Sequence, residues 1–446
     1  MTDLMEHQQK ALDFILQKKK FALFMGYGTG KTLTILSYII QKPEIKNIII
    51  VGKKRNIIFH GIWHNEIEKH QINLTYEFIT GTFEQKQEKI KSSNNLHFIS
   101  YDSIISLQFQ IAWRKYDMII LDESTMIKNP KAKRTKAIHA IIKHIPYSAI
   151  LTGCPVSEHL QDLWSQYHII DIDNRLETTF YKYLTKYFIQ GRFGWNPRQT
   201  SKEKITNLIK INSFFCSTEK VLNLPIKKDI YYPIQCTVEQ KQYIKQLQST
   251  FSLVMQGKKL EYKYILPIII KIQQISSGFI YLENNNVITF PTNKDQCLID
   301  IISKILPNKI IIWCQYKQEI KHLIDFLQKQ NYNTLALTTT NNDIITQFKI
   351  SLDFNILITT YSQLESGESL IEANNAICYA PIWSYNKTKN AMARNRRKGS
   401  EQLHNQIIYH HIYTKNTIEE KIINTLQIKG NMVKALKQYM DKWRLI

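Results

Sequence analysis

The chain has 446 residues, of which 43% are hydrophobic, and its lysines and arginines exceed its acidic residues by 22. This length is too great for one ordinary domain, so we expect two or three domains, each with a sizeable core. No apolar run is as long as a membrane span, and the N-terminal sequence MTDLMEHQQK lacks the apolar core of a signal peptide, which favours a cytoplasmic protein.

The positive charge favours a polyanionic partner such as nucleic acid, because phosphate contacts release counterions. Lysine, isoleucine and asparagine are all abundant, so the charge also fits the drift of an AT-rich genome, such as that of a phage, a virus, a mobile element or a bacterium. None of the six cysteines lies in a C-x-x-C pair, which argues against a zinc site or a redox motif and favours buried, reduced thiols.

Along the chain, short apolar runs rich in β-branched residues alternate with helical stretches. The runs lie at residues 21–24, 47–51, 96–100, 116–121 and 148–151, and a second set lies at 309–314, 354–359, 376–380 and 405–413. Strands that are buried on both faces have such continuous runs, so the pattern predicts an α/β fold with two parallel sheets.

The region between the two sets of strands differs from both. Residues 175–275 are predicted to be mostly helical and are rich in lysine and tyrosine, with a break at 221–229. We place the boundary between two lobes at this break. The predicted lobes are residues 1–225, with a helical protrusion at about 175–215, and residues 226–446, with a helical insertion at about 235–280.

The glycine-rich segment FALFMGYGTGKTLTIL is predicted to form a strand, a loop and a helix. Backbone N–H groups of such a loop and of the following helix N-terminus bind phosphate oxygens. The strict P-loop pattern has a glycine where this chain has Met25, so a plain glycine turn is the alternative. The predicted nucleotide-binding residues are Gly28, Thr29, Gly30, Lys31 and Thr32, with Lys31 on the β- and γ-phosphates and Thr32 on Mg²⁺.

The run YDMIILDEST ends in two adjacent carboxylates. The apolar part stops at Leu121, so Asp122 and Glu123 are expected at the carboxyl end of a strand, where α/β sheets bind ligands. Asp122 is predicted to support Mg²⁺, and Glu123 to polarise the attacking water as a general base. A helix cap is the alternative role for this pair.

Four segments occur in the order of superfamily 2 helicase motors, namely HQQKALDF, MGYGTGKT, LDESTMIKNP and LTGCPV. Others resemble the SNF2-type branch: IIIVGKKRNIIFHGIWHNEIEK is similar to motif Ia, FISYDSI to the next DNA-contacting element, KIIIWCQYKQEIKHLIDFL to motif IV and AMARNRRKGS to motif VI. The first motif of this family usually lacks the early glycine, so Met25 fits the family. The resemblance covers essentially the whole chain and implies two RecA-like P-loop lobes.

The resemblance implies roles for further residues, with ATP and Mg²⁺ as the ligands. Gln8 would read adenine, and Thr152 would couple ATP hydrolysis to the action on DNA. Arg394 and Arg397 would stabilise charge in the transition state. A solvated basic helix face is the alternative for the two arginines. Residues 359–374 resemble a shortened motif V, to which we assign no contacts. The segment NTIEEKI and the lysine-rich stretch after it resemble the C-terminal brace helix of the family.

DNA would lie across both lobes, held by phosphate contacts rather than by base readout. The candidate contacts in the first lobe are Lys53, Lys54, Arg55, Ser100 and Tyr101. Residues 180–195 interleave basic and aromatic side chains. This segment is either a protrusion that grips DNA or a helical pair that buries its aromatic rings and leaves its lysines in solvent.

The resemblance implies an ATP-driven motor that translocates on double-stranded DNA and remodels or displaces bound complexes. A strand-separating helicase on DNA or RNA is the alternative, although no wedge element is apparent, and a nucleic-acid-binding scaffold without ATPase activity is a third. We see no accessory module, so we expect a monomeric motor without membrane contact, whose specificity comes from a protein partner or from DNA structure.

Overall fold

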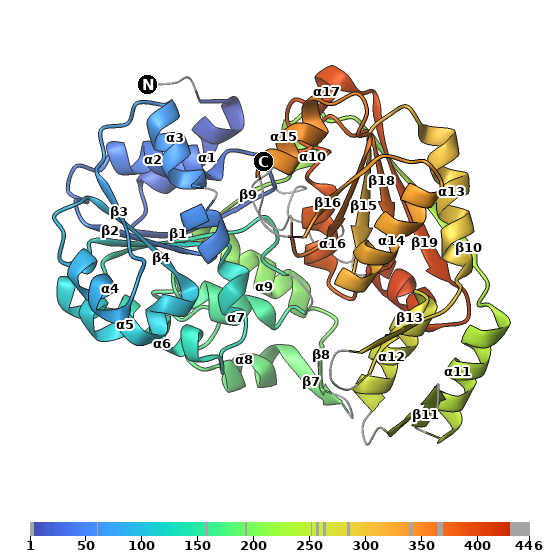
Figure 1. The fold of residues 1–446 in the computed structure, drawn as a ribbon. Helices are drawn as coiled ribbons and strands as arrows, with labels where there is room; N and C mark the ends of the chain where they lie inside the picture. Colours follow the sequence, from blue (N-terminus) through green and yellow to red (C-terminus); the bar gives the residue numbers. More distant parts are fainter. Residues whose placement is uncertain are drawn as a thin grey trace. The chain divides into compact units, whose positions relative to one another are not determined.

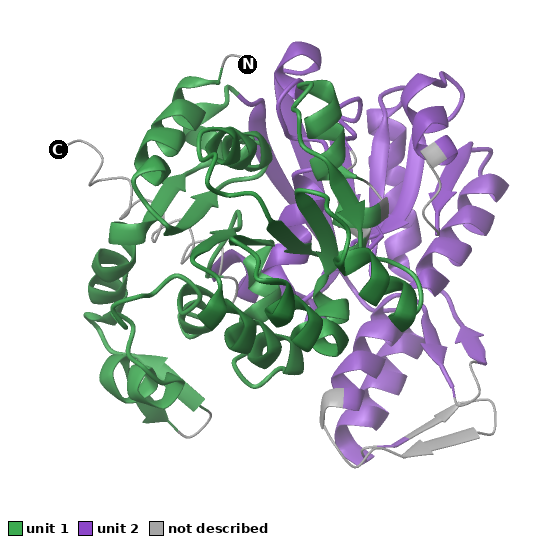
Figure 2. Cartoon of the chain, turned by 90° about the vertical axis from the view of Figure 1, so that its left-hand side faces the viewer, with its two compact units in different colours: residues 1–223, 432–446 green, residues 224–431 purple. Residues whose placement is uncertain are grey.

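The structure is a computed structural model. It describes residues 4–59, 61–156, 159–191, 194–250, 252–255, 258–261, 265–282, 286–338, 342–363 and 369–428. These residues divide into two compact units, and the division falls between Asn223 and Leu224 (Figure 2). The sequence placed the boundary at residue 225.

Unit 1 contains a seven-stranded sheet in the order β3-β4-β2-β5-β6-β1-β9 (Figure 1). All neighbouring strands are parallel. The strands are β1 (Lys20–Met25), β2 (Ile48–Gly52), β3 (Tyr76–Phe78), β4 (Leu96–Ser100), β5 (Met118–Asp122), β6 (Tyr147–Leu151) and β9 (Ser213–Cys216). Strands β2 and β4 are buried at every residue, which explains their continuous apolar runs.

Helices cover both faces of this sheet. One apolar core lies under α1 (Glu6–Leu16), α2 (Lys31–Ile40) and α3 (Ile62–Lys69). The other lies under α4 (Phe83–Ile90), α5 (Tyr101–Arg114), α6 (Lys133–Ile141), α7 (Asp162–Tyr167), α8 (Phe180–Tyr187) and α9 (Ser201–Ile209). A hairpin of β7 (Phe188–Gly191) and β8 (Gly194–Pro197) joins α8 to α9, and α10 (Thr218–Val221) follows β9.

Unit 2 contains a second parallel sheet, in the order β10-β19-β18-β15-β17-β16. Its strands are β10 (Ile226–Ile234), β15 (Ile310–Cys314), β16 (Thr334–Leu337), β17 (Ile356–Thr360), β18 (Asn375–Cys378) and β19 (Gln406–Thr414). Its helices are α11 (Val238–Thr250), α12 (Ile265–Ser276), α13 (Asn293–Ile305), α14 (Lys317–Lys329), α15 (Asn342–Ile350), α16 (Tyr385–Met392) and α17 (Ser400–Leu403). Two hairpins pair β11 (Ser252–Met255) with β12 (Lys258–Glu261), and β13 (Phe279–Tyr281) with β14 (Val287–Thr289).

The two parallel sheets confirm the predicted α/β fold class with two lobes, and all nine predicted strands are present. The prediction that residues 175–275 are mostly helical is wrong in part, because β7 to β12 lie within that range. Two of these strands, β9 and β10, belong to the main sheets. Strand β10 lies at a sheet edge and has exposed lysines, so it has no continuous apolar run to identify it.

Within the described ranges, the structure has no helix that is both long and apolar enough to cross a membrane. All six cysteines are free thiols, and Cys297 alone among them is not fully buried. These same ranges hold no group of three or more histidine, cysteine or acidic side chains that could bind a metal ion.

A buried ion pair links α13 to the segment that follows β19. The Lys294 ammonium lies 2.6 Å from a Glu419 carboxylate oxygen, and both side chains are completely buried. Lys294 also donates to the Tyr379 carbonyl and the Ser277 hydroxyl, while Glu419 accepts from the Thr414 backbone N–H. The charges are therefore compensated by hydrogen bonds as well as by each other.

A second charged contact joins the edge strand β10 of unit 2 to its neighbour β19. His411 on β19 lies opposite Tyr231 on β10, stacks on its ring at 4.7 Å, and places Nε2 2.9 Å from Asp229 Oδ1. Burial alone lowers the pKa of His411, but Cys378 and Asp229 together raise it to about 9. The imidazolium is therefore the stable form at neutral pH.

We predict that this contact makes the stability of the protein depend on alkaline pH. A histidine whose pKa is about 9 in the folded chain stabilises it fully below its ordinary value of 6.5, and this contribution is lost as the pH rises through 9. The stability difference between wild type and His411→Gln should shrink by about 3 kcal/mol between pH 6 and pH 9.5. Urea titrations under reducing conditions measure it, and a difference independent of pH would contradict the assignment.

Candidate nucleotide site

Three neighbouring strands bring the predicted residues to one edge of the first sheet. Strand β6 lies between β1 and β5, so Leu151 pairs with Leu23 on one side and with Asp122 on the other. Parallel strands end at the same edge of a sheet, where the following segments meet. The glycine loop 26–30, Asp122 and Thr152 therefore lie at a common edge in unit 1.

The glycine loop has the backbone conformation that a phosphate-binding loop requires. Gly28 and Gly30 have φ angles of 73° and 78°, in the left-handed region that side chains rarely adopt. Met25, in contrast, is the last residue of β1 and its side chain is completely buried in the apolar core. The early glycine of the strict pattern is thus replaced by a core residue of the strand.

Lys31 and Thr32 form the first turn of α2, directly after this loop. The Lys31 ammonium donates to the carbonyls of Met25 and Gly26, at 2.9 and 3.0 Å. It is near enough to Asp122 to lower the pKa of that carboxyl group. A helix N-terminus, a glycine loop and a lysine beside an aspartate fit a triphosphate with its Mg²⁺.

Helix α1 packs against the glycine loop and contacts it through His7 and Gln8. His7 Nε2 donates to the Thr29 carbonyl at 2.9 Å, and the Thr29 hydroxyl donates to Gly26 O within the loop. The Gln8 side chain is 2% exposed, and its Nε2 lies 3.5 Å from the carbonyl oxygens of Thr29 and Gly30. A Cβ at Gly30 would lie 1.9 Å from that nitrogen, so Gly30 is needed for this close packing as well.

Asp122 is held in place by two buried aromatic side chains. The indole N–H of Trp63 on α3 donates to Asp122 Oδ2 at 3.1 Å, and the Tyr101 hydroxyl donates to the Asp122 backbone carbonyl at 3.0 Å. Both rings are at most 1% exposed. They fix the carboxylate and the end of β5 on which it sits.

Burial raises the pKa of Asp122 above its ordinary value. The hydrogen bond from Trp63 and the charges of Lys31 and Lys53 oppose this shift. A bound divalent cation favours the ionised carboxylate in the same way, because it adds positive charge beside the group. The site therefore suits a carboxylate that is ionised when a metal is present.

Glu123 has a φ of 54°, which is unusual for a residue other than glycine. It precedes the short 3-10 helix η2 (Ser124–Ile127), and its side chain makes no capping hydrogen bond to that helix. The Glu123 side chain therefore does not cap this helix, which was the alternative role. Backbone strain of this kind often marks a functional residue.

The segment LTGCPV, which corresponds to motif III of the family, meets the glycine loop through Thr152 and Gly153. The Thr152 backbone N–H donates to Leu23 O of β1, and its buried hydroxyl accepts from the Cys154 backbone N–H. A Cβ on Gly153 would lie 3.2 Å from the Tyr27 ring, so the loop side chain packs on this glycine. Thr152 thus contacts the strand that leads into the glycine loop.

The segment after β9 is part of the site, and sequence reasoning missed it. The Thr218 hydroxyl donates to Tyr27 O at 2.9 Å, and the Gly26 backbone N–H donates to Cys216 O at 2.8 Å. A Cβ on Gly26 would lie 2.1 Å from the Thr218 hydroxyl. No motif marks Thr218, which lies nearly two hundred residues from the loop, so only the parallel pairing of β1 and β9 identifies it.

Unit 2 carries the two predicted arginines in the turn between α16 and α17, not on a helix. Arg394 is 8% exposed, and its Nε donates to the Asn390 carbonyl at 3.2 Å. Arg397 is partly buried, and its carbonyl accepts from the Ser400 hydroxyl. The alternative of a solvated basic helix face is therefore excluded for Arg394.

The SNF2-related domain family matches residues 7–278, which is more than half of the chain. The chain belongs to the SNF2-related family. The helicase conserved C-terminal domain family matches residues 293–399. This SNF2-related chain is accordingly a member of the nucleic-acid-dependent, helicase-type ATPases.

Relatives of the SNF2-related chain include an ATP-dependent helicase of Mycoplasma genitalium, 25% identical over 97% of this chain and 42% of that protein. The chain therefore spans less than half the length of that relative. Protein p41 of Acyrthosiphon pisum secondary endosymbiont phage 1 is 23% identical over 98% of both chains, which agrees with the predicted phage-like form. A solved Sulfolobus solfataricus SWI2/SNF2 ATPase core in complex with dsDNA aligns over 99% of this chain and 94% of that chain, at 21% identity and a TM-score of 0.46.

Two of the nucleic-acid contacts predicted for the SNF2-related chain have side chains that are buried in the structure. Ser100 is 4% exposed and caps α5 by accepting from Ser103 N, and Tyr101 is 1% exposed with its hydroxyl on Asp122. The Tyr101 hydroxyl thus supports the end of β5 that carries Asp122, whereas the Ser100 hydroxyl supports the first turn of α5. Lys53 is partly buried and Lys54 is exposed, whereas the Arg55 side chain lies outside the described part of the chain.

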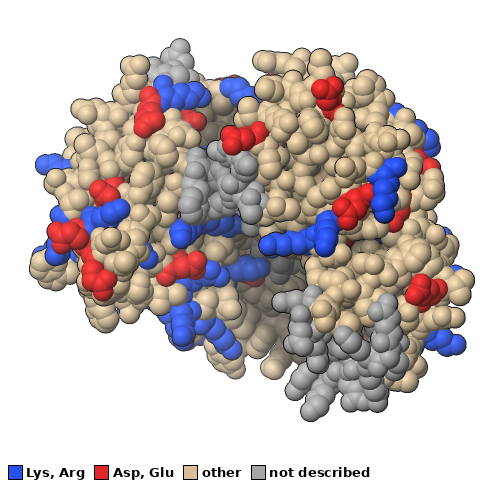
Figure 3. All heavy atoms as spheres, viewed as in Figure 1, with Lys and Arg blue, Asp and Glu red and all other residues tan. Residues whose placement is uncertain are grey.

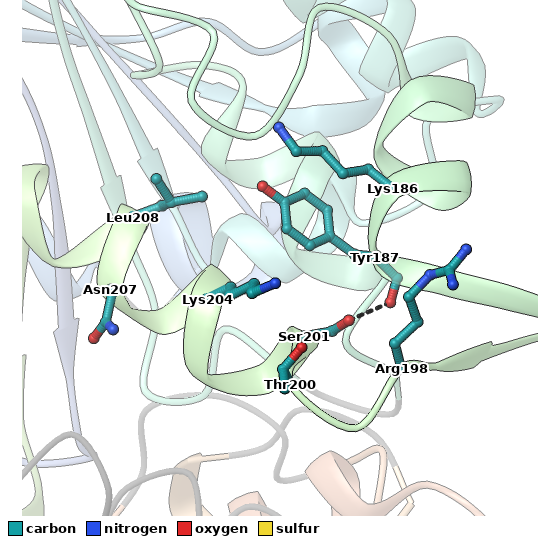
Figure 4. Close-up of a pocket in the computed structure, with 8 residues that line it drawn as sticks. All are labelled: Lys186, Tyr187, Arg198, Thr200, Ser201, Lys204, Asn207 and Leu208. Atoms are coloured by element: carbon teal, nitrogen blue, oxygen red, sulfur yellow. Dashed lines mark hydrogen bonds between the residues drawn. The ribbon is translucent and has the colours of Figure 1, made fainter.

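Residues 180–195 of the SNF2-related chain form α8 and the β7–β8 hairpin, so the predicted second helix is wrong. Three of their rings are buried, as the packing alternative predicted: Tyr183, Tyr187 and Phe188 are at most 3% exposed, whereas Tyr181 is 69% exposed. Beside them, α8 and α9 line an open pocket of about 400 Å³ (Figure 4). The pocket is lined by Lys186, Tyr187, Arg198, Thr200, Ser201, Lys204, Asn207 and Leu208, and Lys186 is paired with Glu177.

Residues 364–368 of motif V and 429–446 of the brace segment lie outside the described residues.

We predict that Trp63→Phe weakens Mg²⁺ use by the ATPase. The substitution removes a donor that lowers the pKa of Asp122, so the pKa rises further and less carboxylate is available to the metal at a given pH. The Mg²⁺ concentration for half-maximal ATPase activity should rise several-fold, and the acid limb of the pH profile should move to higher pH. Trp164→Phe, which also loses a buried indole hydrogen bond, is the matched control and should change neither.

We predict that Gly26→Ala lowers the affinity for ATP at least tenfold, because the new methyl group overlaps the Thr218 hydroxyl and lies 2.7 Å from its backbone nitrogen. Binding of a fluorescent ATP analogue measures the loss. Gly26→Ala/Thr218→Gly should recover part of it, since this removes the hydroxyl contact and leaves the backbone contact. Unchanged affinity in the single variant would show that the loop does not depend on Thr218.

Proposed function

We propose that the chain is a DNA-dependent ATPase motor that translocates on double-stranded DNA and remodels or displaces complexes bound to it. The observation that carries the proposal is the glycine loop, Lys31 and Asp122 at one sheet edge, in a chain of the SNF2-related family with a second parallel-sheet lobe. The SNF2-type branch implies movement along the duplex without strand separation.

In this proposal, ATP binds at the loop 26–30, with Lys31 on its phosphates and Thr32 and Asp122 on Mg²⁺. Mg²⁺ bound with ATP would neutralise charge on the phosphoryl group that is transferred. Glu123 accepts a proton from the attacking water, and its left-handed backbone sets the direction in which it leaves the end of β5. Gln8 packs on Gly30 and would place the adenine contact next to the loop.

Thr152 is the proposed coupling residue. Its backbone is bonded to β1 and its neighbour Gly153 packs on Tyr27, so a shift of the loop on ATP binding reaches motif III directly. Arg394 and Arg397 are proposed to supply positive charge to the transferring phosphoryl group. The burial of Arg394 supports this role, because a guanidinium tied to Asn390 is ordered before any ligand binds.

The proposed nucleic-acid partner is duplex DNA, bound through phosphates. The excess of 22 positive charges supports a polyanionic partner, and lysine and arginine side chains gather at several places on the face drawn in Figure 3. Lys53 and Lys54 remain the proposed contacts in the first lobe. We propose that the motor acts as a monomer in the cytoplasm, and that a protein partner directs it to its sites.

A strand-separating helicase is the second candidate, because superfamily 2 motors of both kinds share these motifs. The two candidates predict different products from the same ATP turnover. A translocase strips a third strand from a triplex as it moves along the duplex, whereas a helicase opens a forked duplex. A scaffold without ATPase activity would do neither.

The test combines ATPase and displacement assays. Wild type should hydrolyse ATP faster with duplex DNA, displace the third strand of a triplex and leave a forked duplex intact. Lys31→Ala should lose ATP hydrolysis by at least 10³-fold, since the lysine carries the phosphate contact. Lys20→Ala, a partly buried lysine at the start of β1 and away from the loop, is the matched control. Efficient opening of the fork favours the helicase, and DNA-stimulated turnover in Lys31→Ala would refute the ATPase site.

A further inference from the structure

Helix α5 has an apolar face that points to solvent. Ile105, Phe109 and Trp113 are 39%, 77% and 83% exposed. They lie four residues apart, so their side chains form one stripe along the helix. The opposite face of α5 already fills the core of unit 1, so the stripe is a second apolar face that the described part of the chain leaves in solvent.

The stripe runs away from the nucleotide site. Helix α5 begins at Tyr101, at the carboxyl end of β4, and Trp113 lies twelve residues further along. At 1.5 Å per residue the helix carries Trp113 roughly 18 Å from that edge, toward the amino ends of the strands. The exposed rings are therefore not part of the edge that holds Asp122 and the glycine loop.

The α6 side of α5 is basic, whereas α4, which also packs against α5, carries Glu84 and Glu88 beside its lysines. Helix α6 packs alongside α5 (Figure 1), and an ion pair of 3.7 Å joins Arg134 to Asp102 at their beginnings. Residues 124–156 contain no acidic residue. Their cationic residues are Lys128, Lys131, Lys133, Arg134, Lys136 and Lys143. Lys133 and Lys136 of α6 are exposed, and Lys115 adds a further exposed charge after Trp113.

We propose that the α5 stripe docks an amphipathic helix of a protein partner, with apolar anchors on one face and carboxylates along its flank. A row of apolar side chains at helical spacing is the usual complement of such a helix. The basic flank selects an acidic segment, because opposite charges steer association and like charges suppress it.

Two other occupants fit this surface less well. A second copy would bring two basic flanks together, and the stripe buries on the order of 400 Å², below the area of a stable dimer interface. The segment 429–446 of this chain carries five basic residues against one acidic residue, so its charge does not complement the flank. A short acidic helix satisfies both the area and the charge.

The experiment uses a fluorescein-labelled peptide of eighteen residues, with leucines at helical spacing on one face and glutamates on its flanks. A second peptide has lysine in place of each glutamate. We expect the acidic peptide to bind the full chain with micromolar affinity by fluorescence anisotropy, and the lysine peptide not to bind. Phe109→Ala/Trp113→Ala should weaken binding at least tenfold, and Lys133→Glu/Lys136→Glu should weaken it several-fold, with DNA-stimulated ATPase activity retained in the first variant.

Tyr181→Ala is the matched control, because Tyr181 is a 69% exposed aromatic residue on a different helix and its loss should leave peptide binding unchanged. The proposal is overturned if the acidic peptide does not bind wild type, or binds the Phe109→Ala/Trp113→Ala variant equally well. It is also overturned if the stripe variant instead loses binding of a single-stranded oligonucleotide, or abolishes a concentration-dependent dimer seen by sedimentation. Peptide binding needs no ATP, so this test is independent of the proposed motor activity.

Discussion

The nucleotide site depends on the parallel register of β1, β6 and β5. Hydrogen bonds between these strands set the heights at which the glycine loop, motif III and Asp122 leave the sheet. A shift of one residue in any of them would exchange the side chains that pack in the two apolar cores on either face of the sheet, so the packing of these cores holds the site geometry as firmly as it holds the fold. The chemistry of this edge is thus fixed by residues that touch no ligand.

Burial and charge are balanced at Asp122. Its surroundings exclude water and disfavour the ionised form, while one indole N–H and two lysines favour it. The side chains that keep this balance come from α3, from α2 and from the turn after β2, all on the same side of the sheet. Trp63, which lies in the segment similar to motif Ia, and Lys31 of the P-loop therefore act on the same carboxylate.

Sequence alone predicted the central strands and not the edges. The four strands of the main sheets that were missed, β3, β9, β10 and β16, are the outer strands of the two sheets. Central strands are covered on both faces and have continuous apolar runs, whereas an edge strand is short or polar on one side. The sequence did not identify Thr218 for the same reason, since its position beside the glycine loop follows from the pairing of the edge strand β9.

Motifs predicted which residues gather near the nucleotide but not which way they face. Tyr101 stands in a DNA-contacting element by sequence, yet its ring is buried and its hydroxyl holds the end of β5. A motif records that a residue is needed, and packing decides whether it contacts the ligand or supports a neighbour that does.

The buried pair of Lys294 and Glu419 limits how the protein can be cut into fragments. A fragment of the second lobe that stops at the last strand would leave an ammonium group without its counterion in an apolar interior, so an expressible second lobe has to extend past Glu419.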